Sequence, residues 1–310
     1  MKFKLNTDEA KLLKKVSGIS SDDIKGAYNI RKDGKAIERV VTDNINIVTK
    51  EDKTGIDIYI KENTVGEQVH IPVIISKSGL KDVVYNDFHV GKNAQVTIIA
   101  GCGIHNCSSD DSEHDGIHRF FLEENAKVTY IEKHYGSGNG TGKKILNPRT
   151  EVNLKKGASL VMDSLQISGV DSTIRETYGK LEEDANLVIT EKIMTDNKQY
   201  AKTIFDVSLD GENSSCKVTS RSIAKDTSYQ EFVSKISGNT KCFGHVECDA
   251  IIMNKAKVIA IPEIDANNVD ARLIHEAAIG KIAGEQLTKL MSLGLSEKQA
   301  EKQIINGFLK

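Results

Sequence analysis

The feature that most constrains the fold is a short unit that recurs between residues 52 and 265. In each copy an Asn, Asp or Gly precedes an Ala, and a short run of strand-forming residues follows. The copies that keep this pattern begin at Asn93, Asn125, Gly157 and Asp184, and weaker copies begin at Asn213 and Asn239. Successive copies are 32, 32, 27, 29 and 26 residues apart, a loose period that is typical of stacked supersecondary units.

This period favours a mainly β protein, with a right-handed parallel β-helix as its core. Strands this short cannot close a hydrophobic core alone, whereas stacked rungs bury one continuous core. The residue that opens each copy suits a tight turn, because Asn, Asp and Gly tolerate left-handed backbone conformations. A β-sandwich or jelly roll is the alternative, since periodicity alone does not distinguish parallel from antiparallel pairing.

Changes in residue pattern along the chain predict three segments. Residues 1–51 are expected to form a small helical and mixed α/β cap, with helix start signals at Thr7 and at Ser20–Asp23. Residues 52–266 carry the repeats and are expected to form the β-helix core.

The third segment, residues 267–310, changes to a helical pattern. Apolar residues from Leu273 onward are mostly spaced by three and four positions, which predicts a C-terminal helical domain. Ser296 and Gln299 have the spacing of a capping box that opens the last helix.

Composition narrows the classes of function. The net charge is −2 and the sequence pI is about 6.5, so no basic face is implied and nucleic acid is not an expected partner. No apolar run approaches the roughly 20 residues of a membrane helix, and the N-terminus lacks the apolar core of a signal peptide. A cytoplasmic protein without a membrane partner is therefore expected. Five cysteines are then free thiols or ligands rather than disulfides, and Cys216 is interpreted as a small buried hydrophobe.

The first candidate site combines a thiol with an imidazole and a carboxylate. Cys248 heads an apolar run typical of a strand, and His275 with Glu276 stands where a helical pattern begins. Thiolate and imidazole select zinc or iron–sulfur chemistry. An iron–sulfur cluster usually takes four ligands, mostly Cys, so a second chain or other ligand types would be needed. The alternative is a buried Cys beside a helix-capping His-Glu pair.

The second candidate site is dense in potential metal ligands, since two Cys and three His fall within 17 residues. Its spacings, Cys-x-x-His and Cys-x4-Cys, match no closed zinc site well. The acidic run between 108 and 115 is also compatible with a plain solvated turn, and His134 beyond it is interpreted as structural. The candidates for extra ligands are Cys102, His105, Cys107, His114 and His118.

Several motifs in order resemble one family, the SufB/SufD scaffold proteins of iron–sulfur cluster assembly. The similarity runs from about residue 70 to the end and fits the short type found in archaea and anaerobic bacteria. The motifs are Arg221-Ser-Ile-Ala, Gly244-His-Val-Glu-Cys-Asp, Pro262-Glu-Ile, His275-Glu-Ala-Ala-Ile-Gly-Lys-Ile, Glu285-Gln-Leu, Gly294-Leu-Ser-Glu and Ile305-Asn-Gly-Phe-Leu309.

The resemblance implies a parallel β-helix whose C-terminal helical domain docks an ABC-type ATPase, SufC. The chain itself would be a scaffold and not an enzyme, with ATP hydrolysis in the partner. A transient Fe–S cluster would be assembled with Cys248 and Glu276, with His275 beside them, and a neighbouring His would keep the thiol deprotonated. The residues expected to contact the ATPase are Ile282, Leu287, Leu290, Met291 and Phe308.

The resemblance also implies a paired scaffold. The second subunit would be another copy of the chain or a SufD-like paralogue, and a sulfur donor and acceptor apoproteins complete the set of partners. The cluster type stays open. The competing hypotheses are a zinc- or iron-dependent β-helix enzyme that uses the Cys102–His118 stretch, a carbohydrate-active β-helix, and a SufC-binding regulator that holds no cluster.

Overall fold

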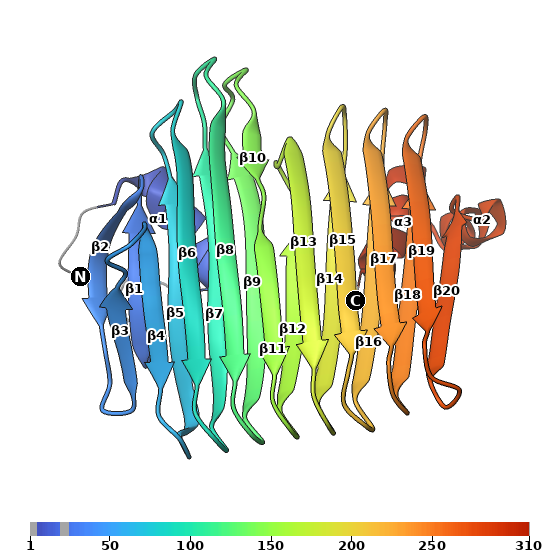
Figure 1. The fold of residues 1–310 in the computed structure, drawn as a ribbon. Coiled ribbons are helices and arrows are strands. Elements are labelled where there is room, and N and C mark those ends of the chain that lie inside the picture. The colour runs from blue at the N-terminus through green and yellow to red at the C-terminus, as the bar shows by residue number, and fades with distance from the viewer. Residues whose placement is uncertain (1–4, 19–24, 310) are drawn as a thin grey trace.

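The computed structural model describes residues 5–18 and 25–309, and it is a long β-helix with a few helices at its ends (Figure 1). Two sheets of ten strands wind around one core, and their strands pair in parallel except for β1–β2 and β3–β4. The predicted parallel β-helix is thus confirmed, and the sandwich alternative is wrong.

Each turn of the β-helix contributes a strand to both sheets. In the order of their pairing, the first sheet contains β2 (Lys35–Val40), β1 (Ala27–Lys32), β5 (Val65–Ile75), β7 (Gln95–His105), β9 (Lys127–Ser137), β12 (Ser159–Gln166), β14 (Asn186–Thr195), β16 (Ser215–Ala224), β18 (Phe243–Ile252) and β20 (Arg272–Gly280). The second contains β19 (Lys257–Ala266), β17 (Tyr229–Gly238), β15 (Tyr200–Leu209), β13 (Ser172–Leu181), β10 (Lys144–Leu146) with β11 (Arg149–Leu154), β8 (Ser112–Leu122), β6 (Lys81–Val90), β4 (Gly55–Ile60) and β3 (Ile45–Thr49).

The recurring sequence unit is the turn that enters the first sheet. Its opening residue adopts the left-handed conformation at Asn93, Asn125, Gly157, Asp184 and Asn213, with φ between 55° and 68°. The alanine that follows each of the first four is fully buried, because it faces the core as soon as the turn ends. The prediction of a further copy at Asn239 is wrong, since this residue follows the end of β17 and is not among the residues with a left-handed backbone.

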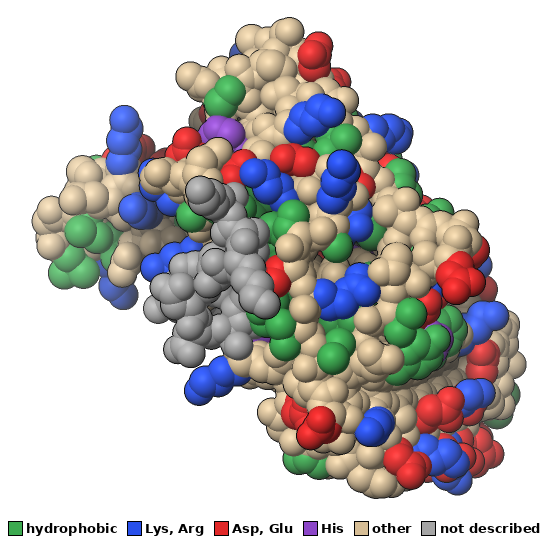
Figure 2. Space-filling model, turned by 90° about the vertical axis from the view of Figure 1, so that its left-hand side faces the viewer, with side chains coloured by type: hydrophobic (Ala, Val, Ile, Leu, Met, Phe, Trp, Pro, Cys, Tyr) green, Lys and Arg blue, Asp and Glu red, His purple; other side chains and the backbone are tan. Residues whose placement is uncertain are grey.

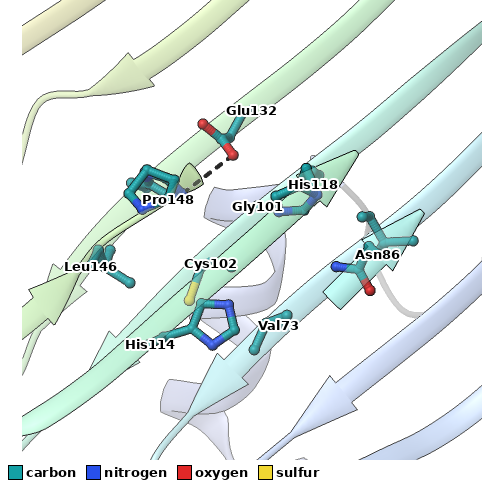
Figure 3. A pocket seen from close by; sticks show the side chains of 13 residues that line it. Val73, Asn86, Gly101, Cys102, His114, His118, Glu132, Leu146 and Pro148 are labelled. Atoms are coloured by element: carbon teal, nitrogen blue, oxygen red, sulfur yellow. Dashed lines mark ion pairs between the residues drawn. The ribbon is translucent and has the colours of Figure 1, made fainter. Parts of the chain in front are cut away.

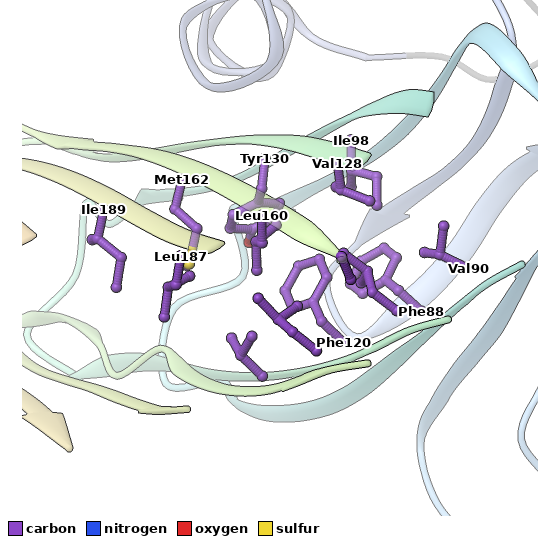
Figure 4. Close-up of a cluster of buried hydrophobic side chains, with 14 of the residues drawn as sticks. Phe88, Val90, Ile98, Phe120, Val128, Tyr130, Leu160, Met162, Leu187 and Ile189 are labelled. Carbon is purple, nitrogen blue, oxygen red and sulfur yellow. The ribbon is translucent and has the colours of Figure 1, made fainter. Parts of the chain in front are cut away.

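The main core is a ladder of inward side chains that runs along the helix axis, and a second, smaller apolar cluster contains Cys102 and Leu146. Strand positions alternate between buried and partly exposed throughout the middle rungs, so every second side chain stacks on its equivalent one turn away. Figure 4 shows part of this ladder, in which Phe88 and Phe120 stack with ring centroids 4.6 Å apart and Tyr130 meets Phe120 edge-on. Such stacking gives each rung a partner on both sides, except at the two ends.

The N-terminal end of the ladder is closed. Antiparallel pairing of β1 with β2 and of β3 with β4 ends both sheets there. Helix α1 (Thr7–Ser17), which begins where the Thr7 signal predicted, packs Leu12 and Leu13 onto the outer face of the first sheet. On this end the acidic and basic side chains are interspersed (Figure 2). The second predicted start, Ser20–Asp23, lies outside the described residues.

The C-terminal end corrects the predicted segment boundary at residue 267. Residues 272–280 form β20, not a helix, because they pair in parallel with β18 over the whole strand. Helices follow only at α2 (Gly284–Ser292) and α3 (Glu297–Phe308). The capping box predicted at Ser296 and Gln299 opens α3. No helix in the described part of the chain is long and apolar enough to cross a membrane.

Candidate functional site

Cys248 lies on β18, the next-to-last strand of its sheet, and points into the core. The burial of β18 alternates, so that Gly244, Val246, Cys248 and Ala250 face inward. Cys248 is 1% exposed and belongs to the main hydrophobic cluster. In register it stands between Ser220 of β16 and Ala277 of β20, so only one further rung separates it from the end of the β-helix.

The surroundings of Cys248 hold it in the thiol form. Burial raises its pKa to about 12, and the carboxylates of Glu191 and Asp249 add to the shift. In the closed rung the charges that act on this thiol are negative, so the role of a neighbouring His in keeping it deprotonated stays a prediction for an opened rung. Thiolate chemistry at Cys248 requires either a bound cation or a movement that exposes the sulfur.

The predicted partners of Cys248 lie on opposite faces of β20. His275 pairs in register with the inward Val246, whereas Glu276 pairs with the outward Glu247. His275 thus shares the core face with Cys248, and neither of its buried ring nitrogens has a hydrogen-bond partner in the described residues. Burial, with the nearby His245, lowers the pKa of His275, so its imidazole is neutral and has a free lone pair.

Glu276 belongs to a group of outward polar side chains on the last two rungs. His245 Nε2 lies 3.3 Å from Glu276 Oε2, and Glu247 is the register neighbour of Glu276. Burial and a hydrogen bond with Glu247 raise the pKa of Asp249 beside them. Carboxylates and imidazole are ligand types that Fe²⁺ accepts, but three of these ligand atoms do not converge within 4.8 Å in this chain alone.

The last rung is open to solvent. Strands β19 and β20 are the terminal strands of their sheets, so each presents an edge without a neighbour among the described residues. By register Ile264 and Ile279 continue the inward ladder, yet they are 45% and 38% exposed. An apolar, unpaired sheet end of this kind favours association with another strand pair.

The C-terminal helices follow β20 after a short linker, Lys281–Ala283. Helix α2 buries none of its residues, whereas α3 buries Ala300 and Ile305. Arg221 of β16 donates a hydrogen bond to the Phe308 carbonyl at 3.4 Å. Of the residues expected to contact a partner, Met291 is 45% exposed and four are half-buried: Ile282, Leu287, Leu290 and Phe308.

Comparison with known proteins places these features in a family. Residues 75–308 match the family model described as SUF system FeS cluster assembly, SufBD core domain. The chain belongs to the SufBD family. Membership of this family supports a role in iron–sulfur cluster assembly.

The similar SufBD proteins include several from archaea. An iron–sulfur cluster assembly SufBD family protein of Archaeoglobus fulgidus is 29% identical over 263 residues, which are 84% of this chain and 70% of that protein. One from Methanocaldococcus jannaschii is 26% identical over 292 residues, or 92% and 90% of the two chains. The chain spans 57% of the length of a Methanothermobacter thermautotrophicus relative. SufB of Bacillus subtilis is 35% identical over 102 residues, covering 32% of this chain and 22% of SufB.

In this SufBD chain the second candidate group is divided by strand alternation. Cys102, His114 and His118 point inward and line one small cavity (Figure 3). His105 and Cys107 lie outside it, where Cys107 is exposed and its sulfur is 3.2 Å from His105 Nε2. The glycines beside Cys102 have a structural role, because a Cβ at Gly101 or Gly103 would collide with α1.

Residues of neighbouring rungs that the sequence did not identify complete the cavity. Glu132 and His134 of β9 line it as well, so His134, interpreted as structural, faces the same space. Arg175 donates to Glu132 at 2.8 Å, to Glu191 at 3.1 Å and to His134 Nδ1 at 2.7 Å. Despite burial, His134 and Arg175 lower the pKa of Glu132 to about 2. In the sequence, the only sign that Glu132 and His134 face this cavity is that they occupy alternate, inward positions of one strand.

One compact group of three potential ligands exists among the described residues, and it lies elsewhere. Ligand atoms of Asp57, Asp87 and His89 fall within 4.8 Å of one another. Lys50 already bridges the two carboxylates at 2.6 and 2.8 Å, and Arg119 binds Asp87. The side chains of Lys50 and Arg119 thus neutralise these carboxylates. Their ion pairs join the N-terminal cap to the first rungs.

Proposed function

We propose that this chain is the scaffold subunit of a SUF-type iron–sulfur assembly complex, in which a nascent cluster is built at a subunit interface. The cluster is the cargo of the scaffold. The observation that carries the proposal is the position of Cys248, one rung beneath an apolar and unpaired sheet end. A second copy of the chain, or a SufD-like paralogue, would dock on that end and bring further ligands toward Cys248.

Pairing at this end answers the need for several ligands. A cluster usually requires four protein ligands, and one chain places only two thiols beneath its last rung, Cys248 and, just before β18, Cys242. Glu276 and His245 on the outer face would receive iron, while Cys248 and His275 on the inner face would accept sulfide-bound iron once the rung opens. Release of the Cys248 proton accompanies binding, because thiolate is the ligating form.

An ABC-type ATPase of the SufC kind would control that opening. Its docking surface would be α2 with the adjoining face of α3, since α2 buries none of its own side chains. Only Lys281–Ala283 separate α2 from β20, so a displacement of the helices is transmitted to the strand that covers Cys248. ATP hydrolysis would belong to the partner, and this chain would have no catalytic step of its own.

The rival of a metal-dependent enzyme at Cys102–His118 is disfavoured by the size of the cavity. Its volume of about 10 Å³ is sufficient for about one water molecule. A substrate would need a route through the sheet and several times this space.

Anaerobic reconstitution with iron and sulfide tests the proposal. Wild type is expected to gain broad visible charge-transfer absorption with matching iron and sulfide content, and Cys248→Ala is expected to lose both. Cys216→Ala, a buried thiol elsewhere in the core, is the matched control and should behave as wild type. If loss followed only the double variant Cys102→Ala/Cys107→Ala, the assembly site would be misplaced.

Docking of the ATPase has its own test. Leu287→Asp and Met291→Asp are expected to abolish co-purification with a SufC-type ATPase from the same organism. The control is Val269→Asp, since Val269 is 99% exposed and lies away from α2 and α3 in sequence. Binding that survives both helix variants would move the ATPase to another surface. ATPase binding by a wild-type chain that never acquires a cluster would favour the regulator hypothesis.

A further inference from the structure

One cysteine of this chain is exposed, and it lies in the N-terminal half of the β-helix. Cys107 follows the end of β7. The structure describes all five cysteines, and the other four are buried. A thiol reacts with reagents from solution only where they can reach its sulfur, so Cys107 is the thiol of the folded chain that is open to such chemistry. The scaffold function proposed above does not use it.

An imidazole lies directly against the sulfur of Cys107. The Cys107 Sγ is 3.2 Å from His105 Nε2, and His105 Nδ1 is 3.0 Å from Ser137 Oγ. His105 and Ser137 are register partners at the ends of β7 and β9. When the Ser137 hydroxyl accepts the Nδ1 proton, the Nε2 lone pair faces the thiol. A nucleophile, a base and a third group that orients the base form the arrangement of an activated nucleophile.

The turn that carries Cys107 is held from inside by its neighbour Asn106, which is fully buried. The Asn106 Nδ2 donates to the Asp110 carbonyl at 2.7 Å. The Asn106 Oδ1 accepts from the Ser108 amide at 3.0 Å and from the Ser78 hydroxyl at 2.9 Å. These hydrogen bonds close the turn, so a fixed backbone presents the sulfur next to the imidazole.

A glycine-rich segment packs against the other side of this turn. The Gly140 amide donates to the Asn106 carbonyl at 3.1 Å. The Gly142 amide donates to the Ser108 carbonyl at 2.9 Å. A Cβ at Gly140 would lie 2.3 Å from the Ser108 carbonyl oxygen, so only glycine allows this close approach. The turn is therefore held between the buried Asn106 and this segment.

A surface pocket of about 430 Å³ opens beside His105. This volume lies within the range of small-molecule sites. From the sheet, His105 and Ser137 line it together with Tyr135. From helix α1, three basic side chains, one carboxylate and one apolar side chain line it: Lys11, Lys14, Lys15, Asp8 and Leu12. A molecule in this pocket would touch the base that faces Cys107.

The α1 side of the pocket carries a net positive charge, because three lysines accompany one carboxylate. Lys11 is 3.6 Å from Asp8, and the Lys15 ammonium lies 3.7 Å from the centre of the Tyr135 ring. In the described part of the chain, Lys14 has no ion pair. Lysines in this arrangement favour a ligand that carries carboxylates.

Two carboxylates follow Cys107 on its own turn, but they lie away from the pocket. Asp111 Oδ1 accepts the Lys143 amide at 2.6 Å. A Cβ at Gly79 would lie 3.7 Å from Asp110 Oδ2, which places that carboxylate against a neighbouring turn. Neither aspartate lines the pocket, so the lysines of α1 set its charge.

We propose that Cys107 exchanges with small disulfides that carry carboxylates, and that it holds one half of the reagent as a mixed disulfide beside the α1 pocket. The S–H proton passes to His105 Nε2 as the Cys107 sulfur attacks one sulfur of the reagent. The new S–S bond forms, the S–S bond of the reagent breaks, and the departing thiolate takes the proton from His105. One disulfide is consumed and one is formed, so the reagent is the only oxidant. The lysines of α1 would bind the carboxylates of the retained half.

Oxidised glutathione, a disulfide with several carboxylates, tests the site on the whole folded chain by intact mass. Wild type is expected to gain one glutathione per chain, because the other four thiols are buried. Cys107→Ser should gain none, whereas the buried-thiol control Cys216→Ser should react as wild type. A folded wild type that gains no glutathione, or labelling that persists in Cys107→Ser, would overturn the proposal.

The role of His105 as a base is tested by the rate of this reaction against pH. At pH 7, His105→Gln should react at least ~10-fold more slowly than wild type, and Ser137→Ala should be slowed less. The difference should shrink above the pKa of about 8.5 of an ordinary thiol, where thiols ionise without a base. The half-buried histidine control, His89→Gln, should keep the wild-type rate. An unchanged rate in His105→Gln, or a loss that is equal at all pH values, would contradict the assignment.

The charge of the reagent tests the pocket. Oxidised glutathione is compared with cystamine, a cationic disulfide, and each rate is divided by that of mercaptoethanol with the same reagent. We expect the anionic disulfide to be favoured by at least ~3-fold at low salt, and the preference to decline as salt is added. The double variant Lys11→Gln/Lys14→Gln should lose the preference, whereas Lys217→Gln, an exposed lysine of β16, should keep it. Equal normalised rates in wild type would overturn the assigned reagent class.

Melting curves must show that each variant is folded. These measurements use neither iron nor sulfide, so failure here leaves the scaffold function untouched. Failure of cluster assembly in the same way leaves the Cys107 site untouched.

Discussion

The two ends of the β-helix differ in how they finish the same ladder. At the N-terminal end two antiparallel pairings and helix α1 cover the first rungs. At the C-terminal end the inward residues Ile264 and Ile279 are left 45% and 38% exposed. A solenoid needs a cap at each end for solubility, so the difference supports the proposal that another subunit covers the C-terminal end.

The same contrast separates the two cysteine sites. Cys102 lies among histidines in a small cavity of about 10 Å³, several rungs away from either end. Cys248 lies beneath a single uncovered rung that is joined to the C-terminal helices by a short linker, which suits a cargo that leaves.

The largest effect is expected when the open end is charged. Ile264→Lys places a cation on the inward face of the last rung, where docking would bury it without a partner. Such burial costs at least ~3 kcal/mol, so self-association should weaken by ~100-fold or more, as measured by light scattering against concentration. Ile174→Lys, at a comparable 41% exposure on a middle rung, should associate normally. Equal association of both variants would mean that the open end is not the interface.

A smaller effect is expected from loosening the closed end. Leu12 is 2% exposed and packs over Gly103, so Leu12→Ala should lower the free energy of unfolding by about 2–4 kcal/mol. Leu293, in the turn after α2 and 75% exposed, is the corresponding residue at the other end, and Leu293→Ala should leave stability unchanged. Denaturant titration measures both, and equal losses would erase the proposed difference between the ends.

The smallest effect is expected on the stability of the protein at low pH. Asp87 is buried, and although burial opposes it, Arg119 and Lys50 lower its pKa below the ordinary 3.8. A carboxyl with a lowered folded-state pKa contributes stability above its unfolded pKa, and that contribution is lost as pH falls through the folded value. Wild type should therefore lose stability below about pH 3.8 more steeply than Asp87→Asn. Asp52→Asn, whose side chain is 71% exposed, should follow wild type in unfolding measured against pH.

The turns of the fold could be predicted from sequence because their chemistry is local. A left-handed residue before a buried alanine requires Asn, Asp or Gly, and Asn93 or Asp184 shows this without knowledge of the rest. The helix predicted over residues 272–280 is wrong for the opposite reason, because the structure of this segment depends on pairing with a distant strand. Leu273, Ile274, Ala277 and Ala278 have helical spacing, but pairing with β18 overrides it.

The sites could be predicted only in part, because register is not visible in sequence. Cys248 was found from its motif, and its strand was expected. His275 and Glu276 are adjacent in sequence, yet the pleat sends them to opposite faces. Cys102 and Cys107 are close in sequence, whereas Glu132 and His134 approach Cys102 from one turn away through the pairing of β7 with β9. In a β-helix, potential ligands that are close together in sequence need not lie close together in space.

The central claim is that the open end assembles a cluster between two subunits, and one measurement tests it most directly. Ile264→Lys keeps Cys248, His275 and Glu276 but disfavours docking. It would be reconstituted anaerobically with iron and sulfide, with Ile174→Lys beside it, and cluster content would be read with molar mass on the same sample. We predict that Ile264→Lys stays monomeric and forms no cluster, while Ile174→Lys forms one for each pair of chains. A stable cluster on monomeric Ile264→Lys would contradict the account.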